Sequence, residues 1–293
     1  MSTILGDLPG PRGRRRALVA SLVATALIAL AVVGSLRRLS VQGQLDPGKW
    51  SLLARPEVLK FLLGGLVNTL KAAAPALVLA MTIGTLLALG RLSGNLLARL
   101  LAGAWVQFFR ALPLLILVIF MYLGLPKLGV NVSPYWALVI ALTIYNGAIL
   151  GEIFRAGILS LDRGQTEAAS AIGLRHWQAM RLVILPQAYR RMIPTIVSQS
   201  VTLLKDTSLG FVITYEELLR RGEITGEFGK NPLQALTVTV ALFWAVNLAL
   251  SRVARHLEVR QRIRYRAEAI SVAGVEDLVA TAVGADARMT TRA

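Results

Sequence analysis

The chain has 293 residues, of which 55% are apolar and 16% are charged, whereas soluble domains average about 45–50% apolar and about 25% charged residues. This charge deficit excludes an ordinary soluble domain, because too few polar side chains remain to cover a water-exposed surface. The 32 Lys and Arg outnumber the 16 Asp and Glu, but they flank apolar runs, which is typical of membrane-protein loops and argues against a nucleic-acid partner.

Cysteine is absent, and His176 and His256 are the two histidines. The sequence therefore predicts no disulfide framework and no metal site.

Six segments are long and apolar enough to cross a lipid bilayer, which takes roughly 20 helical residues. In chain order they are 17–36, 72–90, 101–125, 136–153, 192–213 and 233–250. The expected fold class is all-α, a polytopic membrane bundle of six transmembrane helices. The first segment follows a basic cluster like that of a signal peptide, but its apolar run exceeds the 7–15 residues usual there. That length favours an uncleaved anchor.

The distribution of Lys and Arg predicts the orientation of these helices. With the N-terminus inside, 19 basic residues fall on the inner side, nine on the outer side, and four in or at the ends of spans. Cytoplasmic loops carry the excess of Lys and Arg. We therefore expect a cytoplasmic-membrane protein with both termini in the cytoplasm and 159–191 as its largest interior loop.

Ionisable side chains inside spans are costly and are functional candidates by default. In the third segment, Arg110 precedes Pro113, and a proline kinks a helix. These two residues are gate candidates, or they simply form a bend. In the fourth segment, Glu152 and Arg155 are three residues apart and are expected to pair on one helix face.

The fifth segment contains the polar run Lys205, Asp206, Thr207 and Ser208. Opposed charges and hydroxyl groups at membrane depth suit a substrate that carries both an ammonium and a carboxylate group. Together with Glu152, these four residues are candidates for a substrate pathway. The alternative is that they satisfy one another or neighbouring helices and only hold the bundle in register.

The interior loop reads as a helix–turn–helix outside the membrane. Thr166 is expected to cap the first helix, with Glu167 at the positive end of the helix dipole. Ala168 and Ala169 favour the helix, and Gly173 favours a left-handed stop. A second helix is expected over 174–185, ended by Pro186. Such a hairpin suits insertion into a partner's groove, or it lies as a basic connector on anionic headgroups.

The ordered residues of this loop resemble the cytoplasmic loop of permeases from binding-protein-dependent ABC importers. The resemblance rests on Glu167-Ala168-Ala169, Gly173, Val183 and Leu185-Pro186, where Val183 replaces the usual Ile. Flanking motifs resemble the polar amino acid branch, and they are Phe109–Leu115, Glu152–Ile158, Gly164-Gln165, Pro186–Ala188 and Lys205–Leu209. The similarity extends over roughly residues 66–256.

The resemblance implies a fold, partners and roles. It implies five core helices behind an extra N-terminal anchor. It also implies that Glu167, Ala168, Ala169, Gly173, Leu185 and Pro186 form a coupling loop that docks on a separate ATP-binding ABC subunit. The expected partners are that subunit, a sister permease or a second copy, an extracellular or periplasmic amino-acid-binding protein, and the lipid bilayer. The chain lacks a G-x-x-x-x-G-K-[ST] phosphate loop, so ATP and magnesium are expected on the partner, with no cofactor and no catalytic residue here.

The expected organisation has three parts. Residues 1–60 hold a basic tail, the first span and an outside loop; 61–256 form the permease domain; and 257–293 form a basic, partly disordered C-terminal tail. The expected function is import of polar amino acids, with glutamate as the leading substrate. The alternatives are an ion-gradient-driven secondary transporter, whose two halves are often related, and a membrane scaffold that transports nothing.

Overall fold

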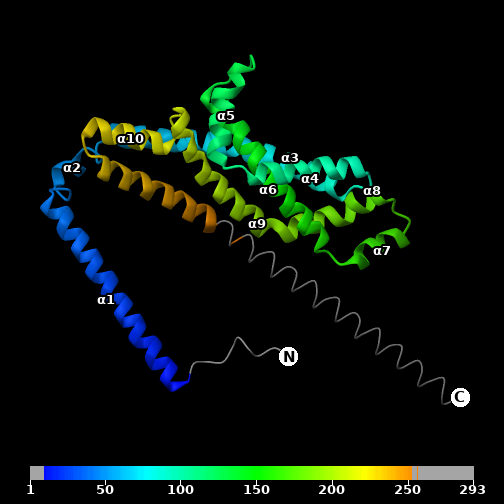
Figure 1. The fold of residues 1–293 in the computed structure, drawn as a ribbon, viewed down its shortest axis with the longest axis horizontal. Helices are drawn as coiled ribbons and strands as arrows, with labels where there is room; N and C mark the ends of the chain where they lie inside the picture. The colour runs from blue at the N-terminus through cyan, green and yellow to red at the C-terminus, as the bar shows by residue number, and fades with distance from the viewer. Residues whose placement is uncertain (1–9, 253–255, 257–293) are drawn as a thin grey trace.

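The computed structural model describes residues 10–252 and 256, and within them it contains helices and no strand. The helices are α1 Pro11–Val41, α2 Pro47–Ser51, α3 Pro56–Leu92, α4 Leu96–Ala111, α5 Leu114–Lys127, α6 Pro134–Leu159, α7 Arg163–Ala171, α8 His176–Ala179, the π-helical turn Met180–Ile184, α9 Leu185–Asp206, the 3-10 helix Thr207–Ile213, α10 Leu218–Gly229 and a last helix, Pro232–Arg252. The predicted all-α membrane bundle is confirmed. Figure 1 shows α2 and α10 at one end of the molecule, which we call the α10 end, and α7 and α8 at the other, the α7 end.

The centre of the bundle is the contact between α3 and α6. Two thirds of the apolar window of α6 is buried, against one third for α3. The helices approach closely because small residues meet: a Cβ added to Gly84 would lie 2.9 Å from Leu150 Cβ, 3.0 Å from the Gly151 nitrogen and 3.1 Å from the Gly147 oxygen. Such contacts between small residues are typical of helix packing in membranes, where van der Waals fit replaces hydrophobic driving force.

The third predicted span is not one straight helix. It is divided into α4 and α5, which are bent by 100° relative to each other, so that α5 projects away from the bundle in Figure 1. Pro113 lacks the N–H that would continue the helix, and its ring disfavours a helical conformation at Leu112, which is extended with ψ 139°. The bend expected at Pro113 is confirmed, and it divides the predicted segment 101–125 into two helices.

Length and composition identify four helices that can span a membrane, or five with the bent α4–α5 pair. The four are 13–41 of α1, α3, α6 and Pro232–Arg252. The predicted fifth span, 192–213, falls on α9 and the following 3-10 helix. Because α9 carries many polar residues, this region is not identified as a span on those criteria, and the predicted count of six is not established.

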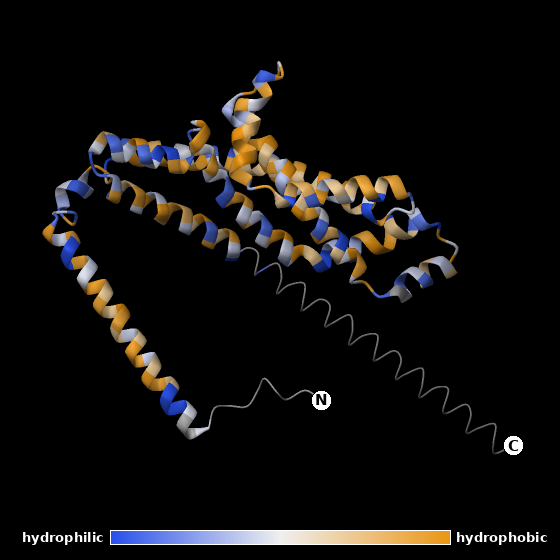
Figure 2. Cartoon of the chain, in the orientation of Figure 1, coloured by the Kyte–Doolittle hydropathy of each residue, from blue (hydrophilic) through white to orange (hydrophobic). Residues whose placement is uncertain are grey.

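The first helix lies apart from the rest of the described chain. None of the residues in its apolar window is buried, and Figure 2 shows it apolar along its middle with hydrophilic residues near both ends. The segment after it is fixed to the bundle: Gln234 donates to the Gln44 carbonyl at 2.6 Å, and Asn231 donates to the Lys49 carbonyl at 2.7 Å. The link from α1 to α3 is thus held at the α10 end.

A buried carboxyl group caps α10. Glu217 is completely buried, and its carboxylate accepts hydrogen bonds from the backbone N–H groups of Leu219 at 2.9 Å and Arg220 at 2.8 Å. Burial raises the pKa of Glu217 to about 7, although those two backbone donors act in the opposite direction. The residue lies in the connection before α10, outside the apolar spans.

Replacing Gly84 by alanine should weaken the α3–α6 contact. The added methyl group meets backbone and Cβ atoms that cannot move independently, so we expect a loss of about 1–3 kcal/mol, seen as a lower apparent melting temperature in detergent. Gly103→Ala is the matched control, because nothing lies within 4 Å of its added Cβ and alanine favours a helix. Equal melting temperatures for the two variants would contradict the proposed packing role.

Glu217 should make stability depend on pH. Its folded-state pKa of about 7 lies above the ordinary value of 4.5, so the protonated group stabilises the fold below pH 4.5, and this contribution is lost as the pH rises to about 7. Glu217→Gln keeps one side-chain oxygen that can accept the cap hydrogen bonds. It should remove the pH-dependent part of the free energy of unfolding, which is on the order of 1–3 kcal/mol.

The measurement is the apparent melting temperature at a fixed scan rate across that pH range, with Glu227→Gln, on the exposed side of α10, as the control. Parallel pH curves for wild type and Glu217→Gln would rule out this role.

Candidate functional site

The loop between α6 and α9 begins with a capped helix. Asp162 caps α7, because its Oδ1 accepts a hydrogen bond of 2.8 Å from the Gly164 backbone N–H. The prediction that Thr166 caps this helix was wrong: an aspartate already satisfies the free N–H groups one turn earlier. Glu167 consequently lies in the middle of the nine-residue helix, outside its first turn, where the dipole has less effect.

The predicted left-handed stop at Gly173 is confirmed. Its φ is +83°, and the Leu174 N–H donates to the Ala169 carbonyl at 3.1 Å, which is the closing bond of a glycine C-cap. The turn reverses the chain toward α8. Nothing lies within 4 Å of a Cβ added at Gly173, so the backbone conformation itself requires glycine here.

The second arm does not end at Pro186. The chain remains helical from α8 through the π turn Met180–Ile184 and continues as α9, with Pro186 in the first turn of α9. A proline lacks an N–H and clashes with the carbonyl four residues earlier in a regular α-helix. The π turn immediately before it changes the hydrogen-bond register, which explains how the helix passes the proline and why this prediction was wrong.

This loop leaves large apolar side chains uncovered. Ile172 is 77% exposed, Trp177 59% and Leu182 63%, and Glu167 and Ala168 are also exposed. Ala169 is only 3% exposed, so it is the one residue of the Glu167–Ala169 motif that packs inward. Exposed apolar side chains gathered on one loop are typical of a surface that a partner covers. Leu185 and Pro186 begin the helix that leads away from it.

Two side-chain contacts attach the loop to the bundle. Gln187 of α9 donates to Gln165 of α7 at 3.0 Å, and the Arg191 guanidinium donates to the Ser160 carbonyl at the end of α6. These contacts join α7 and the end of α6 to the first two turns of α9.

One carboxylate on α6 is surrounded by arginines. Glu152 pairs with Arg155 at 2.6 Å, with Arg91 of α3, and with Arg110 of α4 at 3.9 Å. We call these four residues the arginine–glutamate cluster. The predicted pairing of Glu152 and Arg155 is confirmed, whereas the contacts with Arg91 and Arg110 come from the packing of three helices and were not predicted. Arg110 and Glu152, expected in separate roles, thus belong to one site.

A polar face runs along α9. Arg191, Thr195, Ser198, Thr202 and Lys205 are exposed and recur every three or four residues, so they lie on one side of the helix. Next to this face, the Gln199 amide donates to Asn146 Oδ1 of α6 at 2.8 Å, and Asn146 is completely buried. Sequence reasoning missed Asn146 and Gln199, although a lone amide within the apolar segment 136–153 was a usable signal.

The other predicted pathway residues are less available. The Thr207 hydroxyl is buried and donates to the Leu204 carbonyl at 2.6 Å, and the Ser208 hydroxyl donates to the Lys205 carbonyl at 2.7 Å. Lys205 is exposed and Asp206 is half-buried. Within the described residues, no hydrogen bond or ion pair joins this segment to Glu152, so the predicted pathway residues form two separate groups.

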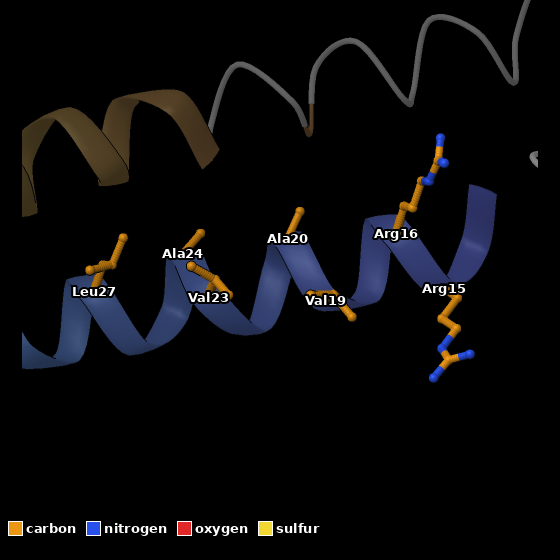
Figure 3. Close-up of a pocket in the computed structure, with 7 residues that line it drawn as sticks. All are labelled: Arg15, Arg16, Val19, Ala20, Val23, Ala24 and Leu27. Carbon is orange, nitrogen blue, oxygen red and sulfur yellow. The ribbon is translucent and has the colours of Figure 1, made fainter. Parts of the chain in front are cut away.

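Two concave surfaces carry no polar site. The first is lined by α1 alone, and Figure 3 shows Arg15 and Arg16 pointing in different directions at its basic end, so they do not converge on a ligand. The second, of 530 Å³, is an apolar groove between α3, α9 and Pro232–Arg252, in which Ser200 is the one polar residue of the described lining. Among the described residues, no group of three or more His, Asp or Glu is arranged to hold a metal ion.

Residues 57–263 match the family described as the inner membrane component of binding-protein-dependent transport systems. The chain is 38% identical over 228 residues to a glutamate transport system permease protein of Corynebacterium glutamicum, a match covering 76% of this chain and 84% of that protein. It is 38% identical to a probable glutamine ABC transporter permease protein of Bacillus subtilis, over 70% and 95% of the two chains.

The fold agrees with these relatives. The crystal structure of an amino acid ABC transporter with histidines superimposes with a TM-score of 0.67 at 30% identity, over 71% of this chain and 98% of the other. A permease is not an enzyme, and the hydrolysis of ATP takes place on the partner subunit. The chain therefore belongs to the family of binding-protein-dependent transport system inner membrane components.

Proposed function

We propose that the chain is the membrane-spanning subunit of an importer for polar amino acids, with glutamate as the leading substrate, driven by ATP hydrolysis on a separate subunit. The observation that carries the proposal is the loop 162–186, which exposes apolar side chains and is attached to the polar helix α9. Relatives named for glutamate and glutamine transport support the substrate class.

In this proposal the α7 end faces the cytoplasm and the α10 end faces outward. The excess of Lys and Arg on the side of this loop supports that orientation, with both termini inside. Residues 61–256 are the permease domain, and residues 1–60 are an added anchor with its outer loop. Residues 257–293 are a tail and lie outside the described residues.

The loop couples ATP hydrolysis to transport. Glu167 and Ala168 meet the ATP-binding ABC subunit directly, and Ala169 packs α7 against the following helical turn. Gly173 sets the reversal between the two arms. Leu185 and Pro186 continue the second arm into α9, so closure of the partner, which binds ATP and magnesium, moves the start of α9.

The substrate pathway follows the polar face of α9. Polar side chains at membrane depth need water or a partner, since lipid cannot satisfy them. A second permease subunit, either another copy or a sister chain, completes this pathway, and an amino-acid-binding protein delivers substrate at the α10 end. Lys205 and Asp206 lie on the pathway, while Thr207 and Ser208 stabilise the end of α9. Arg110 and Pro113 act at the bend between α4 and α5.

An ion-gradient-driven secondary transporter is the competing function. It would need neither the exposed apolar side chains of the loop nor an ATP-binding subunit. Uptake of labelled amino acid into proteoliposomes without that subunit, driven by an ion gradient alone, would overturn the proposal.

Coupling should depend on the glycine turn. Gly173→Val places a branched side chain at φ +83°, which costs about 1–2 kcal/mol or more and misplaces α7. We expect ATP-dependent uptake of radiolabelled glutamate to fall at least about 10-fold, while the ATPase subunit retains its basal hydrolysis. Glu167→Ala should lower uptake in the same direction.

Gly129→Val is the matched control, because Gly129 has φ +82° and, like Gly173, nothing within 4 Å of an added Cβ. Gly129→Val introduces similar backbone strain at a position far from the loop in the sequence. If both valine variants lose uptake equally, strain rather than coupling explains the result and the assigned role of the loop is wrong.

A further inference from the structure

The arginine–glutamate cluster holds more positive than negative charge. Glu152 is the one carboxylate within ion-pair distance of Arg91, Arg110 and Arg155 among the described residues, which leaves an excess of two positive charges. An uncompensated charge at membrane depth is costly. A site of this kind therefore favours a bound anion.

The three arginines are not equally occupied. Arg155 makes two hydrogen bonds to Glu152 Oε1, and Arg91 bonds to Oε2. Arg110 reaches Oε2 only at 3.9 Å, beyond hydrogen-bond distance, and its side chain is 47% exposed. Most of the five N–H donors of its guanidinium thus remain available to a ligand.

Helical periodicity places Arg110 on the inner side of α4. It lies four residues after Val106 and eight after Ala102, both of which are buried, so the three share one face. Val106 packs beside Gly151, since a Cβ added there would lie 3.6 Å from Val106 Cγ2. Leu97, Leu101 and Phe108 are more than half exposed and lie on the opposite, lipid-facing side. Arg110 therefore lies on the side of α4 that packs on α3 and α6 and away from its lipid-facing side.

The cluster lies near the α7 end. Glu152 precedes the end of α6 by seven residues, which is about 10 Å of helix, and Arg91 is in the last turn of α3. On the proposed orientation, this is the cytoplasmic part of the pathway. A substrate reaches it late, after leaving the external binding protein.

We propose that Arg110 binds the α-carboxylate of the transported amino acid at this cluster, the last binding site before release. Glu152 positions the three guanidinium groups and is not itself the group that binds substrate. The geometry suits a carboxylate, since a guanidinium can bind one through two parallel hydrogen bonds. The inference rests on the proposed transport function and extends it to a named contact with a chemical class of ligand.

The first test is uptake by the complete complex, reconstituted in proteoliposomes with its ATPase and binding protein. The probe is whichever of radiolabelled Glu, Gln, Arg and His the wild type transports, because each has an α-carboxylate. Arg110→Gln should lower uptake at least about 10-fold, while ATPase activity stimulated by the loaded binding protein stays within about 2-fold of wild type. Arg110→Lys, which keeps the charge, should retain more uptake than Arg110→Gln.

The matched control is Arg99→Gln on the same helix, because Arg99 is exposed near the start of α4 and makes no ion pair within the described residues. It loses the same charge and should transport as wild type does. Uptake by Arg110→Gln within about 2-fold of wild type would overturn the inference. Equal losses of uptake in Arg110→Gln and Arg99→Gln would also overturn it, because the removal of one positive charge from α4 would then explain both.

A second measurement does not depend on the folding of Arg110 variants. The chain has no cysteine, so a cysteine at Ala156, exposed and four residues after Glu152 on α6, is unique within it. A water-soluble, negatively charged methanethiosulfonate should label Ala156→Cys at least about 10-fold faster than Leu101→Cys, because thiols ionise in water and not in lipid.

The transported amino acid should slow this labelling, whereas chloride at the same concentration should not. Failure of a transported amino acid to protect Ala156→Cys would overturn the inference and point to a fixed lipid phosphate or to a structural brace. If the wild-type complex transports no amino acid, the proposed function itself falls. If the wild-type complex transports an amino acid normally, but that amino acid does not protect Ala156→Cys and Arg110→Gln does not lower uptake, the proposed function stands. Only the contact with Arg110 is then wrong.

Discussion

The close contact between α3 and α6 is the constraint on which the rest of this structure depends. Gly84 lies so near Gly147 and Gly151 that a single added methyl group would meet atoms of α6 at 2.9–3.1 Å. This approach places Glu152, the residue after Gly151, within reach of Arg91 near the end of α3. α4 then packs its Val106 side beside Gly151, which brings Arg110 to the same carboxylate. Small residues thus determine where the charges meet.

α9 runs between the two ends of the molecule, and its sides differ in character. One side, with Ala188, Met192 and Ile196, packs into the core, and another carries the exposed polar face that ends at Lys205. Its first turn is attached to α7 through Gln187. A helix with these contacts is suited to convert movement of the loop into a change along a polar pathway, and it is too polar to be recognised as an ordinary span.

Sequence reasoning succeeded where the determining interaction is local. Apolar length predicted α1, α3, α6 and the last helix, since lipid accepts only segments that satisfy their own backbone. The turn at Gly173 and the pairing of Glu152 with Arg155 were also predicted, because both depend on residues a few positions apart. It failed where several local signals compete. Asp162 rather than Thr166 caps α7, and the π turn allows the helix to continue past Pro186.

The sequence by itself determined that this chain is a helical membrane protein with a glycine-reversed loop, and its ordered motifs determined the family. Only the tertiary structure decided that Arg91, Arg110 and Glu152 meet, that Asn146 bonds Gln199, and that Arg110 retains free donors. The physical reason is distance along the chain: these partners lie between 42 and 61 residues apart, on helices whose relative position is set by packing. No local pattern specifies which faces of such helices come together.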